Sequence, residues 1–211
     1  MSKLLIIRHG RTIGNKNKWF YGKTDLPLLP EGIEELEKQR DEGLYPEISE
    51  SALCFTTGLG RTAETFRVVF GERDYEPVKD LRELNFGICE CKSFDELKDE
   101  PLFKEWLNDQ SGEFVFPEGE SQNQFKERVH RGFQYVLDRH AENDEKSVGA
   151  GDVNTVVVCH GGVIAEILDK LFPGEKESLW DWMPEPGSGY LLDIEDGEVK
   201  NPCLLGSLTI Y

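Results

Sequence analysis

Residues 4–12 read LLIIRHGRT: four aliphatic side chains are followed directly by an arginine, a histidine and a glycine. An apolar run without alternation is typical of a strand that is buried on both faces of a parallel sheet. Arg8 and His9 then stand at the carboxyl end of that strand. Because ligands of open α/β sheets bind outside the carboxyl ends of the strands, these two residues predict a polar site there.

Strand-like and helix-like segments alternate over the rest of the chain. This order predicts an α/β fold with a mostly parallel sheet that is covered by helices on both faces. Besides 4–7, strands are expected at 52–57, in part of 77–87, at 155–159 and in a hairpin that turns near Asp196-Gly197. Helices are expected at 30–43, 60–71, 93–109, 163–172 and after Ser121, and capping boxes at Ser93–Glu96 and Ser121–Gln124 open two of them.

Two further segments are expected to lie outside the sheet. Residues 143–154 are polar and predict a surface loop. Residues 88–120 carry several aromatic side chains and predict a helical lid over the strand ends. We expect a single domain, 1–211, with this lid as an insertion at about 88–120.

A second strand exit has the same pattern as the first. Residues 156–162 read VVVCHGG, so two of the four histidines, His9 and His160, each follow a buried strand and precede a glycine. Parallel strands bring their carboxyl ends to one edge, so we expect the two imidazoles to lie close together. Glycines such as Gly161 let the backbone approach a ligand, and a helix that starts there offers N–H donors to an anion.

Two more residues are expected at this edge. Arg61 follows the strand at 52–57, and with Arg8 it forms a pair of guanidinium groups suited to bidentate contacts with an oxyanion. At about 4 Å and an effective dielectric of about 20, each such contact contributes about 4 kcal/mol before desolvation. In a site built for a phosphate, Glu83 could supply a proton to the leaving oxygen.

Composition narrows the class of partner. The net charge of −17 argues against nucleic acid and anionic membranes, because both favour positive surfaces. No apolar run approaches about 18 residues, and the first one is too short for a signal peptide, so a cytoplasmic protein is expected. The five cysteines are odd in number and form no CxxC pair, which favours reduced thiols over disulfides or a zinc site.

The ordered set of motifs resembles the histidine phosphatase superfamily, the phosphoglycerate mutase-like proteins. The segments that carry the resemblance are Arg8-His9-Gly10 with Thr12 and Asn15, GKTDLPLLPEG at 22–32, TTGLGRTAET at 56–65, LRELNFGICE at 81–90, PEGES at 117–121 with Arg128, and CHGGVI at 159–164. The resemblance implies a phosphoglycerate mutase-like fold. Arg-His-Gly alone is a weak signal, but the full set in this order is specific.

The resemblance also implies roles for individual residues. His9 would be the nucleophile that becomes phosphohistidine, with His160 and Glu83 as the other catalytic residues. The phosphoryl group would be bound by Arg8, Arg61, Asn15 and Gly161. The substrate rim is expected to include Arg11, Tyr21 and Gly22. Arg11 departs from the family, which often has Glu at this position, and it is expected either to contact a second acidic group of the substrate or to be a solvated surface residue. No metal or other cofactor is implied, because the cationic groups would do what Mg²⁺ does in other phosphoryl-transfer enzymes.

The class of activity leaves alternatives. The length and the short LNFGICE segment favour a phosphatase acting on a small phosphomonoester, and FYGKTDLPL with NFG resembles α-ribazole phosphatases. The alternatives are a phosphoglycerate mutase and a catalytically silent member that binds a phosphorylated ligand; whether the chain forms a homodimer stays open. A cysteine phosphatase is disfavoured because six residues, rather than five, separate Cys54 from Arg61.

Overall fold

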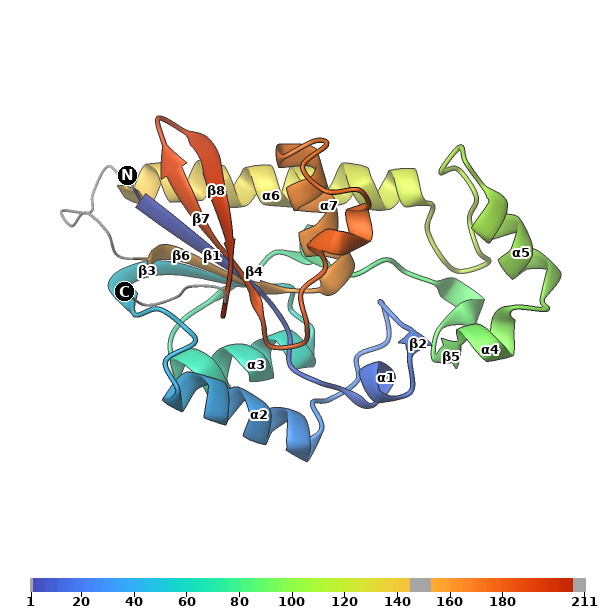
Figure 1. Ribbon diagram of the computed structural model, residues 1–211, viewed down its shortest axis with the longest axis horizontal. Helices are drawn as coiled ribbons and strands as arrows, with labels where there is room; N and C mark the ends of the chain where they lie inside the picture. Colours follow the sequence, from blue (N-terminus) through green and yellow to red (C-terminus); the bar gives the residue numbers. More distant parts are fainter. Residues whose placement is uncertain (1, 145–152, 207–211) are drawn as a thin grey trace.

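Burial on both faces explains why the first strand is so apolar. The computed structural model describes residues 2–144 and 153–206. Within these residues, β1 (Ser2–Arg8) lies inside a six-stranded sheet of order β4-β3-β6-β1-β7-β8 (Figure 1). The strands β4, β3, β6 and β1 run parallel, whereas β7 and β8 form an antiparallel hairpin at the β1 edge. The expectation of a mostly parallel sheet is therefore confirmed.

The remaining elements follow the predicted alternation. The other strands of the main sheet are β3 (Ile48–Thr56), β4 (Glu76–Pro77), β6 (Val153–Cys159), β7 (Gly189–Glu195) and β8 (Glu198–Leu204). The short strands β2 (Trp19–Phe20) and β5 (Lys92–Ser93) pair with each other. The helices are α1 (Ile13–Lys16), α2 (Pro30–Asp41), α3 (Gly60–Phe70), α4 (Phe94–Leu97), α5 (Pro101–Asn108), α6 (Gln122–Asp144) and α7 (Gly161–Leu171).

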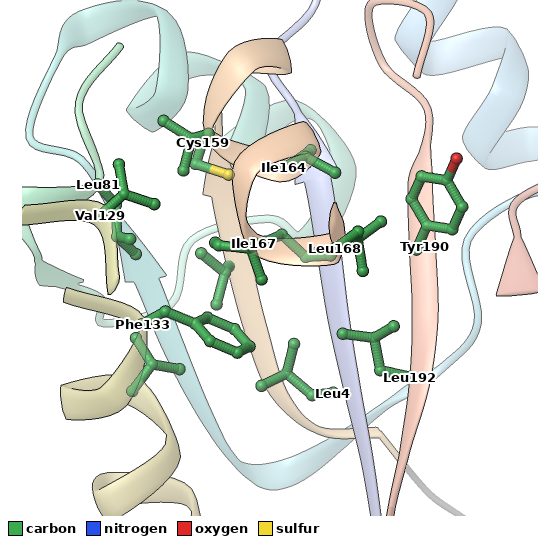
Figure 2. Packing of buried hydrophobic residues seen from close by; sticks show 14 of the residues in the cluster. Leu4, Leu81, Val129, Phe133, Cys159, Ile164, Ile167, Leu168, Tyr190 and Leu192 are labelled. Atoms are coloured by element: carbon green, nitrogen blue, oxygen red, sulfur yellow. The ribbon is translucent and has the colours of Figure 1, made fainter. Parts of the chain in front are cut away.

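Helices cover both faces of the sheet, as predicted. In Figure 1, α6 and α7 lie on one side of the strands, and α2 and α3 lie on the other. Along β1 the side chains alternate between the two layers. Leu4 and Ile6 pack in the cluster with α6 and α7, part of which is drawn in Figure 2, whereas Leu5 and Ile7 pack with Phe66 of α3. This two-sided packing holds the end of β1 in place.

The segment expected as a lid has a core of its own. Cys89, Leu97, Phe103 and Phe116 form a buried cluster, against which Trp106 and other aromatic rings pack. In Figure 1, α4 and α5 lie beyond the end of the main sheet, next to α1 and β2. The prediction of one helix over 93–109 is wrong: the Ser93–Glu96 capping box opens α4, but α5 begins separately at Pro101. A proline cannot continue the preceding helix because it lacks the N–H group.

The predicted hairpin turn is confirmed, whereas the strand predicted within 77–87 forms only in part. The hairpin turns at Asp196-Gly197, where both residues have positive φ, as a two-residue hairpin turn requires. Only Glu76–Pro77 pairs as a strand near the predicted 77–87 stretch, and a 3₁₀ turn over Lys79–Leu81 follows it. Most of the loop predicted at 143–154 lies outside the described residues.

All five cysteines are free thiols. Within 2–144 and 153–206, no helix has the length and apolarity to cross a membrane.

Candidate active site

The two strand-exit histidines meet at the carboxyl edge of the sheet. β1 and β6 stay paired to their ends, where the His9 N–H donates to the Cys159 carbonyl at 3.0 Å. His160 follows β6 directly and precedes α7. The two imidazole centroids are 5.2 Å apart at an interplanar angle of 67°. Both residues are almost fully buried, with 3% and 1% of their surface exposed.

The hydrogen bond of His9 determines which ring nitrogen carries the proton. His9 Nδ1 lies 2.7 Å from the Gly10 carbonyl oxygen. A carbonyl oxygen only accepts, so Nδ1 is the donor, and in the neutral ring Nε2 has the free lone pair. Burial, together with the nearby charges of Arg61 and Arg8, holds the pKa of His9 well below its ordinary value. Near neutral pH His9 is therefore an uncharged imidazole whose Nε2 can act as a nucleophile.

Backbone carbonyls hold both guanidinium groups next to the histidines. Arg8 Nη1 donates to the Pro184 carbonyl at 2.8 Å. The Arg8 guanidinium lies so close to Gly161 that a Cβ there would be 3.1 Å from Arg8 Nε. Arg61 is fully buried, and its Nη1 and Nη2 donate to the carbonyls of Thr24 and Gly22 at 2.8 Å each. These bonds position both side chains while leaving their Nε–H groups without such a partner.

Buried nitrogen atoms without hydrogen-bond partners occur in and next to the two histidines. Six buried side-chain nitrogen or oxygen atoms of the described residues lack a hydrogen-bond partner, and three of them are Arg8 Nε, Arg61 Nε and His160 Nδ1. Buried polar atoms without partners are rare in folded proteins, and each one calls for an explanation. The two unpaired guanidinium N–H groups indicate a binding site for an anion. The imidazole nitrogen can contact the same anion as a donor only when it carries a proton.

Glu83 reaches the same place from a distant part of the chain. Its Oε2 accepts a hydrogen bond from the Gly162 N–H at 2.8 Å, in the first turn of α7, and its Oε1 accepts one from the Leu84 N–H at 3.1 Å. A Cβ at Gly162 would lie only 2.5 Å from Glu83 Oε1, so the glycine makes this approach possible. The carboxyl group is thus held beside the two histidines and lines the adjoining cavity.

A polar network joins the first turn after β1 to the β2 segment. The Thr12 and Tyr21 hydroxyls are 2.7 Å apart, and the Tyr21 hydroxyl donates to Asn15 Oδ1 at 3.0 Å. Asn15 Oδ1 also accepts from the Thr12 N–H at 2.9 Å, so only the amide NH₂ group of Asn15 could contact an anion. The Tyr21 ring lies under the Arg61 guanidinium, with 5.0 Å between the Cζ atom and the ring centroid.

A cavity of about 680 Å³ opens beside His9, whereas His160 and Arg61 are not among the residues that line it. Arg8, His9, Asn15, Tyr21, Glu83 and Gly161 all line it. Aromatic side chains from five parts of the chain line it, together with charged residues such as Lys18 and Lys126. Besides Tyr21, the aromatic residues are Trp19 and Phe20, Phe86, Trp106, Phe125 and Trp180. The predicted lid contributes to this lining through Trp106, Leu107 and Asp109. A ligand that extends from His9 into this cavity would therefore contact aromatic side chains.

Two residues expected at the rim are placed elsewhere. Arg11 does not line the cavity; its Nε lies 3.3 Å from Glu35 Oε2 on the surface, with 42% of its side chain exposed. Gly22 does not line the cavity either, because its carbonyl binds Arg61 and a Cβ there would overlap the Leu84 carbonyl oxygen. Tyr21 is the one rim residue whose placement agrees with the expectation.

Sequence reasoning missed several residues of the site. Thr57 Oγ1 lies 3.1 Å from His160 Nε2, and Trp180 and Glu166 line the cavity. The doubled threonine at the end of β3 is a weak signal for the first, because Thr57 occupies a strand exit like His9 and His160. Glu166 lies one helical turn after Gly162, which places it on the same side of α7. Trp180 carries no such signal in its local sequence.

The described part of the chain has no cluster of metal-ligating side chains at or near this site. Among the residues of 2–144 and 153–206, no group of three or more His, Cys, Asp or Glu side chains is arranged to hold a metal ion.

Comparison with known proteins identifies the class. The family model of the histidine phosphatase superfamily (branch 1) matches residues 4–202. The chain therefore belongs to the histidine phosphatase superfamily, as the ordered motifs predict.

Relatives within the superfamily carry two kinds of name. The "Probable phosphoglycerate mutase GpmB" of Yersinia pestis (strain Pestoides F) is 30% identical over 146 residues, which cover 65% of this chain and 64% of that protein. The alpha-ribazole phosphatase of Shigella flexneri has a similar structure, with a TM-score of 0.78 at 25% identity over 97% of this chain and 96% of the other. A phosphoglycerate mutase from Thermus thermophilus has a TM-score of 0.62 at 27% identity, over 95% and 98% of the two chains. The fold is thus phosphoglycerate mutase-like.

Proposed function

We propose that this protein is a phosphatase that hydrolyses a small phosphomonoester through a phosphohistidine on His9. The observation that carries the proposal is the tautomer of His9: the Gly10 carbonyl holds the proton on Nδ1, which leaves the Nε2 lone pair beside the unpaired donors. A nucleophile next to two buried guanidinium groups with unpaired N–H donors is an arrangement suited to phosphoryl transfer.

The chemistry proceeds in two displacements. His9 Nε2 attacks the phosphorus atom in line, the P–N bond forms, and the P–O bond to the leaving group breaks. Arg8, Arg61 and His160 hold the phosphoryl oxygens while negative charge is redistributed in the transition state. Glu83 gives a proton to the leaving oxygen and then takes one from the water that attacks phosphohistidine, which releases phosphate and restores His9.

We further propose that the reaction needs no metal ion. The two guanidinium groups carry full positive charges, and carbonyl hydrogen bonds hold both of them in place. Charges fixed in this way stabilise a transferring phosphoryl group without reorganisation, which is the task that Mg²⁺ performs in other phosphoryl-transfer enzymes.

An aromatic or otherwise apolar leaving group fits the cavity best. Several aromatic side chains line it, and one of them, Trp180, is 63% exposed. The similarity to the alpha-ribazole phosphatase of Shigella flexneri favours an α-ribazole phosphatase-like substrate within this class. Phosphoglycerate mutase activity is the second candidate, because the Yersinia pestis and Thermus thermophilus relatives carry that name.

The test of this proposal is to trap the intermediate. Mixing the protein with p-nitrophenyl phosphate, in the presence of EDTA, and quenching it with base should yield a base-stable, acid-labile phosphoprotein. His9→Ala should form no phosphoprotein and turn over no substrate, because the attacking nitrogen is gone. A metal requirement would appear as loss of turnover with EDTA and recovery with Mg²⁺. A folded protein that binds phosphate yet forms no phosphoenzyme would be a silent member.

A panel of substrates separates phosphatase from mutase. A phosphatase should release phosphate from α-ribazole 5′-phosphate and aryl phosphates. A mutase should instead convert 3-phosphoglycerate in the presence of 2,3-bisphosphoglycerate, with little release of phosphate. Efficient isomerisation with slow hydrolysis would overturn the phosphatase proposal while leaving the role of His9 intact.

A further inference from the structure

We propose that Thr57 and Thr62 form a hydrogen-bond relay that keeps the proton of His160 on Nε2, so that His160 must take up a second proton when the site binds a tetrahedral dianion. Thr57 is then a positioning residue, which acts through His160 and does not touch the substrate. The inference rests on the proposed function in one respect: it takes His160 as a ligand of the phosphoryl oxygens.

The direction of the relay is set at Thr62. Its Oγ1 lies 2.8 Å from the Leu59 carbonyl oxygen, which can only accept. A hydroxyl has a single proton, so this bond uses the only donor that Thr62 has. Thr62 Oγ1 is thereby left as an acceptor, and the backbone N–H of Thr57 donates to it at 3.3 Å.

The same reasoning then fixes Thr57 and His160. Thr57 Oγ1 lies 3.1 Å from Thr62 Oγ1, and since Thr62 cannot donate there, Thr57 must. The Thr57 hydroxyl proton is now also in use. Its remaining contact, to His160 Nε2 at 3.1 Å, can only be one that it accepts, so Nε2 of His160 carries a proton.

The proton on Nε2 determines what the other ring nitrogen, Nδ1, presents to a ligand. His160 Nδ1 is buried and has no hydrogen-bond partner among the described residues. When Nε2 carries the only proton, Nδ1 presents a lone pair, which repels the oxygen of an anion. Nδ1 donates a hydrogen bond only when the ring is doubly protonated. His160 can therefore bind a phosphoryl oxygen through Nδ1 only as an imidazolium.

Burial and the surrounding charges keep His160 neutral in the free protein. Burial, and then the charges of Arg61, His9, Arg8 and Arg128, hold the pKa of His160 well below its ordinary value. Arg8 and His9 lie at the end of β1, Arg61 on α3 and Arg128 on α6. Glu83, bound to the Gly162 N–H, is the acidic group on this side. A bound dianion opposes the field of the arginines, so it favours the charged ring. Binding and proton uptake are thereby linked.

Sulfate is a suitable probe because it is a tetrahedral dianion that does not titrate near neutral pH. The measurement is isothermal titration calorimetry at about pH 7 in buffers with different ionisation enthalpies, which counts the protons taken up per sulfate bound. It is made in the His9→Ala protein, so that the nucleophile cannot contribute a proton. We expect uptake of close to one proton, and an affinity that falls by up to about tenfold per pH unit above the pKa of free His160.

Two variants of Thr57 isolate the relay. Thr57→Ser keeps the hydroxyl and should keep the proton uptake. Thr57→Val removes the acceptor, so the neutral ring can move its proton to Nδ1 and bind sulfate directly; uptake should fall towards zero. Thr62→Val should act in the same direction, because Thr57 is then free to donate to Nε2. It serves as the second variant if Thr57→Val does not fold.

The outcomes distinguish the relay from the proposed function. Sulfate that binds the His9→Ala protein without proton uptake, or full uptake that survives in both valine variants, would overturn the relay and leave the phosphate site standing. An Nδ1–H signal for His160 in the ¹⁵N NMR spectrum of the free protein would overturn it as well. Failure of the folded protein to bind sulfate at all would overturn the phosphate site itself, and the relay with it.

Discussion

His9 and His160 lie with their rings 5.2 Å apart, and their hydrogen bonds place the proton on opposite nitrogens: Nδ1 in His9 and Nε2 in His160. The partner of His9 is the carbonyl of the next residue, whereas that of His160 is a threonine from a different strand exit. The two imidazoles therefore differ in what they present to a ligand, although they follow their strands in the same way. In the proposed mechanism, His9 uses its Nε2 lone pair to attack phosphorus, whereas His160 binds an oxygen through Nδ1 only after it has taken up a second proton.

Arg61 is expected to contribute to both stability and activity. Its side chain is buried and donates to the carbonyls of Gly22 and Thr24, so Arg61→Ala leaves two buried acceptors unpaired. We expect a loss of about 2–5 kcal/mol in the free energy of unfolding and a fall in kcat/KM of about 100-fold or more. Urea denaturation and steady-state kinetics measure the two effects. Arg67→Ala, at an exposed position of the same helix, should change neither; equal losses in both variants would contradict this role.

Gly14 is expected to be required by the Tyr21 ring. A Cβ at Gly14 would lie 2.5 Å from the ring, and the Tyr21 hydroxyl is held by Thr12 and Asn15, so the ring cannot easily move away. Gly14→Ala should therefore cost about 1–3 kcal/mol of stability and reduce activity. In a Tyr21→Leu background the same substitution should cost much less, because the clash is gone. A double-mutant cycle measures this coupling, and simple additivity would show that the contact is not restrictive.

The buried histidines predict that stability is lost as the pH falls. The pKa values of both His9 and His160 are lowered by burial first and then by nearby arginines. Below about pH 6.5 the unfolded chain binds protons that the folded protein does not, so each ring lowers the free energy of unfolding by up to about 1.4 kcal/mol per pH unit, until its folded-state pKa is reached. Urea denaturation between about pH 7 and 5 should show a shallower slope for His9→Ala by that amount. Parallel slopes would contradict an uncharged His9.

Trp180 is expected to favour apolar leaving groups. It lines the outer cavity and is largely exposed, so an aromatic leaving group packed against it would bury part of both rings. Such burial contributes about 1–2 kcal/mol, and Trp180→Ala should therefore raise the KM for 1-naphthyl phosphate by about tenfold. The KM for glycerol 3-phosphate should change little. Phe94→Ala is the control, because Phe94 is 51% exposed but does not line the cavity. An equal effect on both substrates would argue against a leaving-group subsite.

Some features of this protein follow from the sequence because their causes are local. The apolar run before Arg8 and the matching run before His160 each specify a buried strand, and parallel pairing then brings the two histidines to one edge. The hairpin turn at Asp196-Gly197 and the capping boxes follow from the backbone preferences of a few neighbouring residues. The break at Pro101 is also local in origin, although the capping pattern alone suggested a continuous helix.

The arrangement of the site was decided by contacts between distant residues. Glu83 is held by a backbone N–H that lies 79 residues further on, and Arg61 by carbonyls 37 and 39 residues before it. Arg11 contacts Glu35, which lies 24 residues further along the chain and which folding brings beside it. The sequence determined which groups stand at the strand ends, since periodicity and turn preferences act over a few residues. Which nitrogen carries a proton, and which donor stays unpaired, depends on hydrogen-bond partners that only the folded chain brings within about 3 Å.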